Sequence, residues 1–381
     1  MKKMAVLFIL LVLWGCSSNQ EILKGTGIKL NSLGFLPGSV KQASVSTKCS
    51  EFEVKDAATG EVVWKGKTTG PLYRKDVDEQ VWTADFSPVT APGEYYLDGR
   101  HVGHSVNFKV GTRVYNEAYV TAMRGIYLWR CGMEIAGGHN GLIYHQDACH
   151  LDDGYDDYTG NPGHKRDGTG GVSHKLTRLP LEPFIMASAD TARRYFSDWS
   201  FAATADFVAM TAQASRVFQP YDTAYSSRCL AAARLNYRIE ENRDWGEQGN
   251  LGMFTYLLSR REGKNPAIQD TLLKNCLHIA GQIVNQSRND VYRRPFGGRC
   301  YWGCNGTIAR QTVNLFAANR LKPDPLYVGT ALDAIGHLFG RNYYLRSFVT
   351  GLGIDPPMNL HDRRSAADQV REPWPGYLVG G

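Results

Sequence analysis

The spacing of apolar residues changes once along this chain, near residue 111, and the change constrains the fold more than any other feature. Before it, apolar and polar residues alternate in short runs, separated by turns such as Leu36-Pro37-Gly38 and Ala91-Pro92-Gly93. Such alternation is typical of half-buried strands, and about seven of them at this spacing are typical of an immunoglobulin-type β-sandwich. We therefore expect a β-sandwich over residues 27–110. Its predicted strands lie in runs 28–30, 43–45, 52–54, 62–64, 81–86, 94–97 and 106–110.

Beyond that point, apolar residues recur three and four positions apart, which is the period of an amphipathic helix. Asp222 suits an N-cap, and Pro266 and Pro325 suit the first turn of a helix. The sequence therefore predicts an all-α second domain over residues 111–381, with long polar loops between helices. The predicted helices are 114–130, 201–218, 223–237, 251–259, 266–284, 307–318 and 326–338.

The first 15 residues have the pattern of an export signal. Lys2 and Lys3 precede an apolar run, Met4 to Trp14, that is too short to span a bilayer. The ending Leu13-Trp14-Gly15-Cys16 is similar to a bacterial lipobox, in which the cysteine is acylated and becomes the new N-terminus. We expect an envelope lipoprotein, held by Cys16 at the outer membrane or cell surface, outside the cytoplasm. The alternative is an ordinary signal peptide with a chance cysteine.

Composition excludes one class of partner. The 43 basic and 37 acidic residues are mixed along the chain without a dense basic tract, so nucleic acid is not an expected partner. Of the eight cysteines, seven remain once Cys16 is set aside. An odd number in an oxidising compartment leaves at least one cysteine free or metal-bound.

Several segments resemble the family 9 glycoside hydrolases of the cellulase type. Residues 28–38 are similar to the start of the immunoglobulin-like module that precedes many of their catalytic domains. Residues 347–363 follow the signature around the family's active-site histidine, except at Asp355, where Asn, Lys or Arg is expected. The resemblance implies an (α/α)6 barrel behind a β-sandwich, and inverting hydrolysis of β-1,4-glucans in polysaccharide breakdown. Weaker similarities lie in the middle helices, 202–207 and 228–233, and in the cleft loop, 301–306, with Cys304 where serine is usual.

The same resemblance points to candidate site residues. His361 occupies the place of the active-site histidine, and it and Arg363 form the His-x-Arg pair that hydrogen-bonds sugar hydroxyls in the family. Tyr301 and Trp302 would form a stacking platform for a glucose ring. The alternatives are a loop whose charges pair locally, with Asp362 or Asp368, and aromatic rings that simply fill the core.

Two motifs of the family are missing from the 381 residues. The family's general base lies in a Trp-His-Asp-Ala-Gly-Asp motif, but here residues 168–171 run directly into residues 172–177, which resemble a segment normally found several helices later. The general acid lies in an Asn-Glu stretch near the family's C-terminus, and this sequence ends before it. Inverting hydrolysis needs both carboxyl groups. We therefore expect an internally deleted, C-terminally truncated and incomplete barrel with little or no activity.

Possible metal sites are also incomplete. Cys131, Cys149 and His150 match the spacing of a structural zinc site in some family members, whose fourth ligand is the histidine of the missing motif. The candidates to replace it, by proximity, are His164 and His174. The alternatives are a Cys131–Cys149 disulfide or two unpaired thiols. The acidic run 152–157 is either a solvated loop or a calcium site, and Asp206 suits helix packing better than catalysis.

Three functions follow from this pattern. The first is a family 9 hydrolase that acts on β-1,4-glucans or related plant polysaccharides. The second is a lipoprotein that binds such carbohydrates without cleaving them. The third is a decayed gene product that folds poorly. The missing motifs favour the second and third for this polypeptide, whereas the resemblance to the family favours the first.

Overall fold

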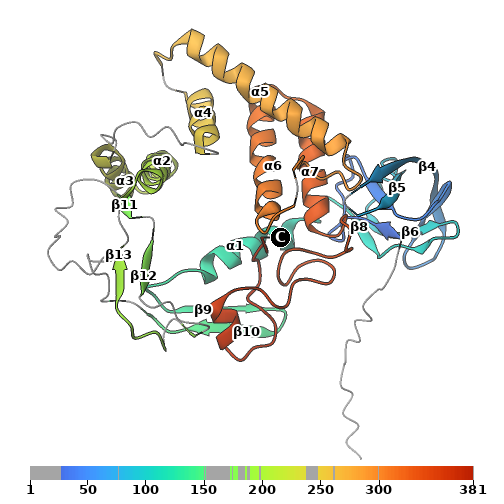
Figure 1. The fold of residues 1–381 in the computed structure, drawn as a ribbon, viewed down its shortest axis with the longest axis horizontal. Coiled ribbons are helices and arrows are strands. Elements are labelled where there is room, and N and C mark those ends of the chain that lie inside the picture. Colours follow the sequence, from blue (N-terminus) through green and yellow to red (C-terminus); the bar gives the residue numbers. More distant parts are fainter. Residues whose placement is uncertain are drawn as a thin grey trace, which may run out of the picture.

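The computed structural model describes residues 27–75, 77–149, 151, 172–173, 175–178, 185–186, 189–196, 199–236, 248–260, 262–298 and 300–380. It shows a β-rich N-terminal domain packed against a helical domain (Figure 1). Within the described residues, no helix is both long and apolar enough to cross a membrane.

The N-terminal domain is a folded antiparallel sheet. Strand β4 pairs through its first part with β3 and through its second part with β5, so the sheet turns over and encloses a core. The rings of Phe35, Phe86 and Phe108 meet there, with centroids 5.0–5.5 Å apart. The predicted β-sandwich is thus present, with β7 as an additional strand. The strands are β1 (Ile28–Lys29), β2 (Gln42–Val45), β3 (Glu51–Asp56), β4 (Val62–Arg74), β5 (Glu79–Asp85), β6 (Gly93–Gly99), β7 (Gly103–His104) and β8 (Phe108–Val110), in the order β1-β2-β5-β4-β3-β6-β7, with β8 on β6.

Each of the predicted helices is found in the structure, with ends that shift by a few residues. Local capping fixes two of the starts: Asn265 accepts a hydrogen bond from the backbone N–H of Ala267, and Asp324 accepts one from that of Leu326. The helices are α1 (Asn116–Leu128), α2 (Phe201–Phe218), α3 (Thr223–Asn236), α4 (Gln248–Leu258), α5 (Pro266–Arg288), α6 (Cys304–Leu321), α7 (Pro325–Leu338) and the short α8 (Arg363–Ala367).

The second domain also contains short ribbons that the helical period did not predict. In the longest of them, β9 and β10 are joined by Asn140 and Gly141, both at positive φ (+50° and +81°), which is the backbone of a tight hairpin turn. The expectation of a purely α domain is corrected in this respect. The ribbons pair β9 (Ile135–His139) with β10 (Leu142–Gln146), β11 (Val172–Ser173) with β14 (Trp199–Ser200), and β12 (Leu176–Arg178) with β13 (Arg194–Phe196).

The helices do not close into a ring in the described part of the chain. Figure 1 shows α2 and α3 as a pair standing apart from the group of α5, α6 and α7. On α1, apolar side chains face outward, with Tyr119 68% and Ile126 67% exposed. A helix with such a face is normally covered by a neighbour. This exposure agrees with the expected incomplete barrel.

Buried polar contacts fasten the sandwich to the helical domain. The guanidinium of Arg341 donates to Ser44 Oγ at 3.1 Å and pairs with Asp333 at 3.0 Å. Ser44 Oγ in turn donates to the backbone oxygen of Val291 at 2.8 Å. Directional contacts of this kind hold two domains in one orientation, because a shift would leave the buried Arg341 Nε–H and the Ser44 hydroxyl without their hydrogen-bond partners.

Candidate functional site

The signature segment 347–363 is fixed at its start by the C-terminal segment 373–380. Thr350 is fully buried, and its backbone N–H donates to the oxygen of Tyr377 at 3.0 Å. Its hydroxyl donates to the oxygen of Trp374 at 2.7 Å and accepts from the N–H of Tyr377 at 2.9 Å. The signature threonine therefore organises the last turns of the chain rather than facing solvent.

His361 is exposed in the bend that leads into α8. The next residue, Asp362, caps that helix by accepting from the N–H of Ser365 at 3.0 Å. The local ion pair with Asp362, considered as the alternative for Arg363, is made by Arg364, whose Nε lies 3.8 Å from Asp362 Oδ1. The hydrogen-bonding role of His361 and Arg363 toward sugar hydroxyls stays a prediction.

Arg364 also carries a structural role that the sequence did not reveal. Its guanidinium lies 4.8 Å from the ring centre of Trp374 and donates to the backbone oxygen of Leu128 at 2.6 Å. Trp374 Nε1 donates to Asp368 at 2.6 Å. Asp368, the other carboxylate considered for local pairing, is therefore bound to an indole N–H.

Tyr301 and Trp302 stand at the start of α6. Their rings are 6.5 Å apart at nearly a right angle, and they are 48% and 85% exposed. Trp302 thus does not fill the core. The hydroxyl of Tyr301 lies 2.6 Å from that of Thr307, which fixes the phenol ring against the first turn of the helix. Two neighbouring exposed rings, of which that of Tyr301 is fixed, have the form of a stacking surface for a sugar face, and that role remains a prediction.

The C-terminal segment joins these parts. The backbone oxygen of Gly380 accepts from the N–H of Asn305 at 2.8 Å, beside Trp302, and the N–H of Val379 donates to Phe348 at 2.9 Å. The C-terminal segment 373–380 therefore contacts the start of α6 beside the aromatic pair, the signature, and the residues that follow the His361 bend. Sequence reasoning identified the residues but not this connection.

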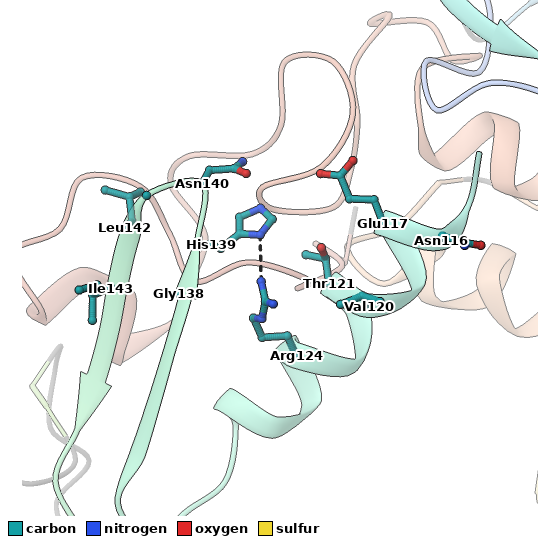
Figure 2. A pocket seen from close by; sticks show the side chains of 11 residues that line it. Asn116, Glu117, Val120, Thr121, Arg124, Gly138, His139, Asn140, Leu142 and Ile143 are labelled. Atoms are coloured by element: carbon teal, nitrogen blue, oxygen red, sulfur yellow. Dashed lines mark hydrogen bonds between the residues drawn. The ribbon is translucent and has the colours of Figure 1, made fainter. Parts of the chain in front are cut away.

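A hollow of about 630 Å³, lined by both polar and apolar residues, lies between α1 and the β9–β10 hairpin. Figure 2 shows Glu117, His139 and Asn140 around it. His139 Nε2 lies 2.9 Å from the oxygen of Gly351 in the signature, and its Nδ1 lies 3.3 Å from Arg124. Because a carbonyl only accepts, Nε2 carries the proton and Nδ1 accepts from the guanidinium.

This hollow was not predicted from the sequence, although one signal was available. Asn140-Gly141 is a strong hairpin signal, and it would have placed His139 at the tip of a ribbon. Of the side chains that line the hollow, Glu117 is the one carboxylate. Inverting hydrolysis requires a pair of carboxyl groups roughly 6.5–9.5 Å apart. The hollow therefore offers polar contacts to a ligand, but not an acid–base pair.

Of the candidate zinc ligands, the structure describes Cys131 and Cys149. Cys131 Sγ and Cys149 Sγ lie 3.4 Å apart, and Gln146 Nε2 lies 3.1 Å from Cys149 Sγ. Two thiolates on one tetrahedral zinc would be about 3.8 Å apart, given Zn–S bonds of about 2.3 Å, and a disulfide would be about 2.05 Å. The thiols fit either outcome after a small shift. Among the described residues no cluster of three or more metal ligands is found, while His150, His164, His174 and the acidic run 152–157 lie outside the described residues.

Comparisons with known proteins identify the family. Residues 24–104 match the profile of the cellulase N-terminal ig-like domain, and residues 244–381 match that of glycosyl hydrolase family 9. Endoglucanase D of Acetivibrio thermocellus is 37% identical, over 93% of this chain and 77% of the relative. The chain belongs to glycoside hydrolase family 9.

Other relatives of this protein also belong to the family of β-1,4-glucanases, or share its fold. A xyloglucan-specific endo-β-1,4-glucanase of Bacteroides ovatus is 25% identical, over 96% of this chain and 87% of the relative. The crystal structure of a metagenome-derived family 9 endoglucanase superposes with a TM-score of 0.82 at 23% identity, covering 93% of this chain and 90% of that one. The fold likeness confirms the expected architecture of an immunoglobulin-like domain followed by a helical domain related to (α/α)6 barrels.

The alignment also bears on the missing base motif. It extends over 485 positions, more than the 381 residues of the whole chain, so it contains long gaps on the side of this chain. The family 9 profile begins at residue 244, well after the abrupt junction at residues 171–172. The gaps agree with an internal deletion, and its place at this junction stays a prediction.

Proposed function

We propose that this protein acts on β-1,4-linked glucans, as a family 9 protein of the endoglucanase type in polysaccharide breakdown. The observation that carries the proposal is the exposed Tyr301–Trp302 pair, held beside the family signature by the C-terminal segment. A β-1,4-glucan presents a flat face of C–H groups on each sugar, which suits aromatic rings, and hydroxyls at its edge, which suit His361 and Arg363.

A second candidate is glucan binding without hydrolysis by this polypeptide. The specific observation in its favour is the junction at residues 171–172, where the Trp-His-Asp-Ala-Gly-Asp motif is absent. Ring stacking and hydroxyl hydrogen bonds need no titrating carboxylate, so recognition survives the loss of the base. The two candidates share one ligand and differ only in turnover.

Replacing Trp302 should test the ligand. We expect Trp302→Ala to weaken binding of cellohexaose by about tenfold, because an aromatic contact contributes roughly 0.5–1.5 kcal/mol beyond the area that it covers. Isothermal calorimetry on the full chain measures this. Trp64→Ala is the matched control, since Trp64 is a partly exposed tryptophan on β4, in the sandwich. Equal affinities of wild type and Trp302→Ala would remove the aromatic pair from the binding surface.

We further propose that Cys131, Cys149 and His150 hold a structural zinc ion, with His164 or His174 as the fourth ligand. The pair of thiols within 3.4 Å supports this, because thiolates and imidazole in a tetrahedral set suit zinc. Protein purified under reducing conditions should contain zinc, and Cys149→Ser should lose most of it in elemental analysis. Cys276→Ser, at a buried cysteine on α5, is the control. A metal-free wild type would favour the disulfide.

We also propose that Cys16 is acylated and anchors the protein in the cell envelope. The support is the sequence around Cys16, which lies outside the described residues. Wild type should incorporate labelled palmitate and sediment with membranes, whereas Cys16→Ala should do neither. A second substitution, Cys49→Ala in the sandwich, serves as the control, and labelling of wild type and Cys16→Ala alike would contradict the anchor.

A further inference from the structure

A second hollow, of about 420 Å³, lies at the junction between the sandwich and the helical domain. Its walls come from strand ends and loops of the sandwich, with Lys29, Glu79 and His101, and from the turn after α7, with Tyr343 and Tyr344. This volume falls within the range of about 300–1,000 Å³ that is typical of small-molecule sites. None of these residues belongs to the candidate site described above.

Two exposed aromatic rings form one wall. Tyr343 is 43% and Tyr344 is 68% exposed, and their ring centres are 5.1 Å apart at an angle of 89°. Adjacent rings at a right angle present one face and one edge to the same space. A ligand can therefore stack on one ring while its rim meets the other phenol, and each ring carries a hydroxyl that donates and accepts hydrogen bonds.

The turn that carries these rings is rigid. Asn342 is 1% exposed, and its side-chain nitrogen donates to the backbone oxygens of His337 and Arg346, both at 2.7 Å. Its side-chain oxygen accepts from the N–H of Tyr344 at 3.1 Å. Leu345 has φ +51°, a left-handed conformation that costs a leucine about 1–2 kcal/mol. A strained residue persists only where the surroundings fix it, so the backbone that carries the two tyrosines is held in place before any ligand arrives.

The floor of the hollow is polar but electrically balanced. The ammonium of Lys29 lies 3.2 Å from Glu79 Oε1 and 2.8 Å from the hydroxyl of Tyr292, and 5.0 Å from the ring centre of Tyr343. The hydroxyl of Tyr292 also donates to Glu79. Because the one cation and the one carboxylate are paired, the floor offers hydrogen bonds without a net field. A charged ligand would gain little here, while a neutral ligand with many hydroxyls would gain both stacking and hydrogen bonds.

We propose that this hollow is an accessory binding site for a neutral sugar unit of a glucan chain. The ligand class rests on the proposed function, and the site deepens it by adding a second contact. Helices α6 and α7 run antiparallel because only residues 322–324 connect them. The start of α6, with Trp302, and the turn after α7, with Tyr343, therefore lie at the same end of this helix pair. A long chain that meets both contacts gains avidity without any change in either site.

The test measures how tightly wild type and variants of the full chain bind a long glucan, with substitutions in the accessory site alone. We expect the double variant Tyr343→Ala/Tyr344→Ala to weaken binding of soluble mixed-linkage glucan by about tenfold, from two lost aromatic contacts. Tyr343→Phe/Tyr344→Phe should keep most of the affinity, since the rings remain. Tyr221→Ala, at an exposed tyrosine after α2, is the matched control and should bind as wild type does. Affinity electrophoresis in gels with and without the glucan measures all four.

If the double variant does not fold, as judged by its circular dichroism, Tyr344→Ala alone replaces it, because this ring is mostly exposed. Unchanged affinity in the alanine variants would overturn the accessory site. That outcome is separable from failure of the proposed function, which is decided by Trp302→Ala and cellohexaose. Equal losses in Tyr221→Ala and in the double variant would also overturn the site, since they would show a nonspecific effect.

Discussion

A polypeptide of these 381 residues should release reducing ends from cellulose, xyloglucan or mixed-linkage glucan no faster than its His361→Ala variant. General acid–base assistance contributes about 10²–10⁴-fold per group. Without both groups the barrier rises by about 5–11 kcal/mol if the effects add, and residues that act as a unit often do not add. Positioning by His361, Arg363 and the aromatic pair does not replace a proton donor, because an alkoxide is a poor leaving group at neutral pH.

The measurement is a reducing-end assay run beside calorimetric binding of the corresponding oligosaccharides. Endoglucanase D of Acetivibrio thermocellus, the 37% identical relative, is the positive control. Binding without turnover supports the second candidate function. Turnover of wild type clearly above that of His361→Ala would show that another carboxylate, such as Glu117 in the hollow beside α1, has taken over the chemistry. Neither turnover nor binding would favour the decayed gene product.

Trp374→Ala should lower the free energy of unfolding by about 3–5 kcal/mol, the usual cost of truncating a buried tryptophan. Trp374 is fully buried, and its ring meets Tyr144 at 5.9 Å and the guanidinium of Arg364 at 4.8 Å. Its removal leaves a cavity beneath the His361 bend. It also leaves Asp368 without the indole N–H that now donates to it. Urea denaturation followed by circular dichroism gives the change.

Trp374→Phe separates packing from hydrogen bonding. It retains an aromatic ring but no N–H donor, so we expect a smaller loss of about 1–3 kcal/mol, chiefly from the lost hydrogen bond to Asp368. Trp302→Ala is the surface control and should leave the unfolding midpoint nearly unchanged, because that ring is 85% exposed. A Trp374→Ala variant as stable as wild type would mean that the C-terminal segment does not anchor the signature.

Much of the local structure could be predicted because it depends on neighbouring residues. Alternation over residues 81–86 marks β5, and the three-to-four spacing over residues 201–218 marks α2 with both ends correct. The spacing of apolar residues did not predict the shortest strands. Ribbons of two or three residues, such as β12 with β13, contain no full period, and they form because their partners are brought together from elsewhere in the chain.

The sequence by itself determined the two-domain order, the family and the residues of the signature, since these reside in local patterns and motifs. Tertiary structure decided which side chains meet. It joined His139 to Gly351, brought the guanidinium of Arg364 to the backbone oxygen of Leu128, and set Tyr343 beside Lys29. The physical reason is separation along the chain. Contacts between residues hundreds of positions apart depend on how whole elements pack, and no local period records that packing.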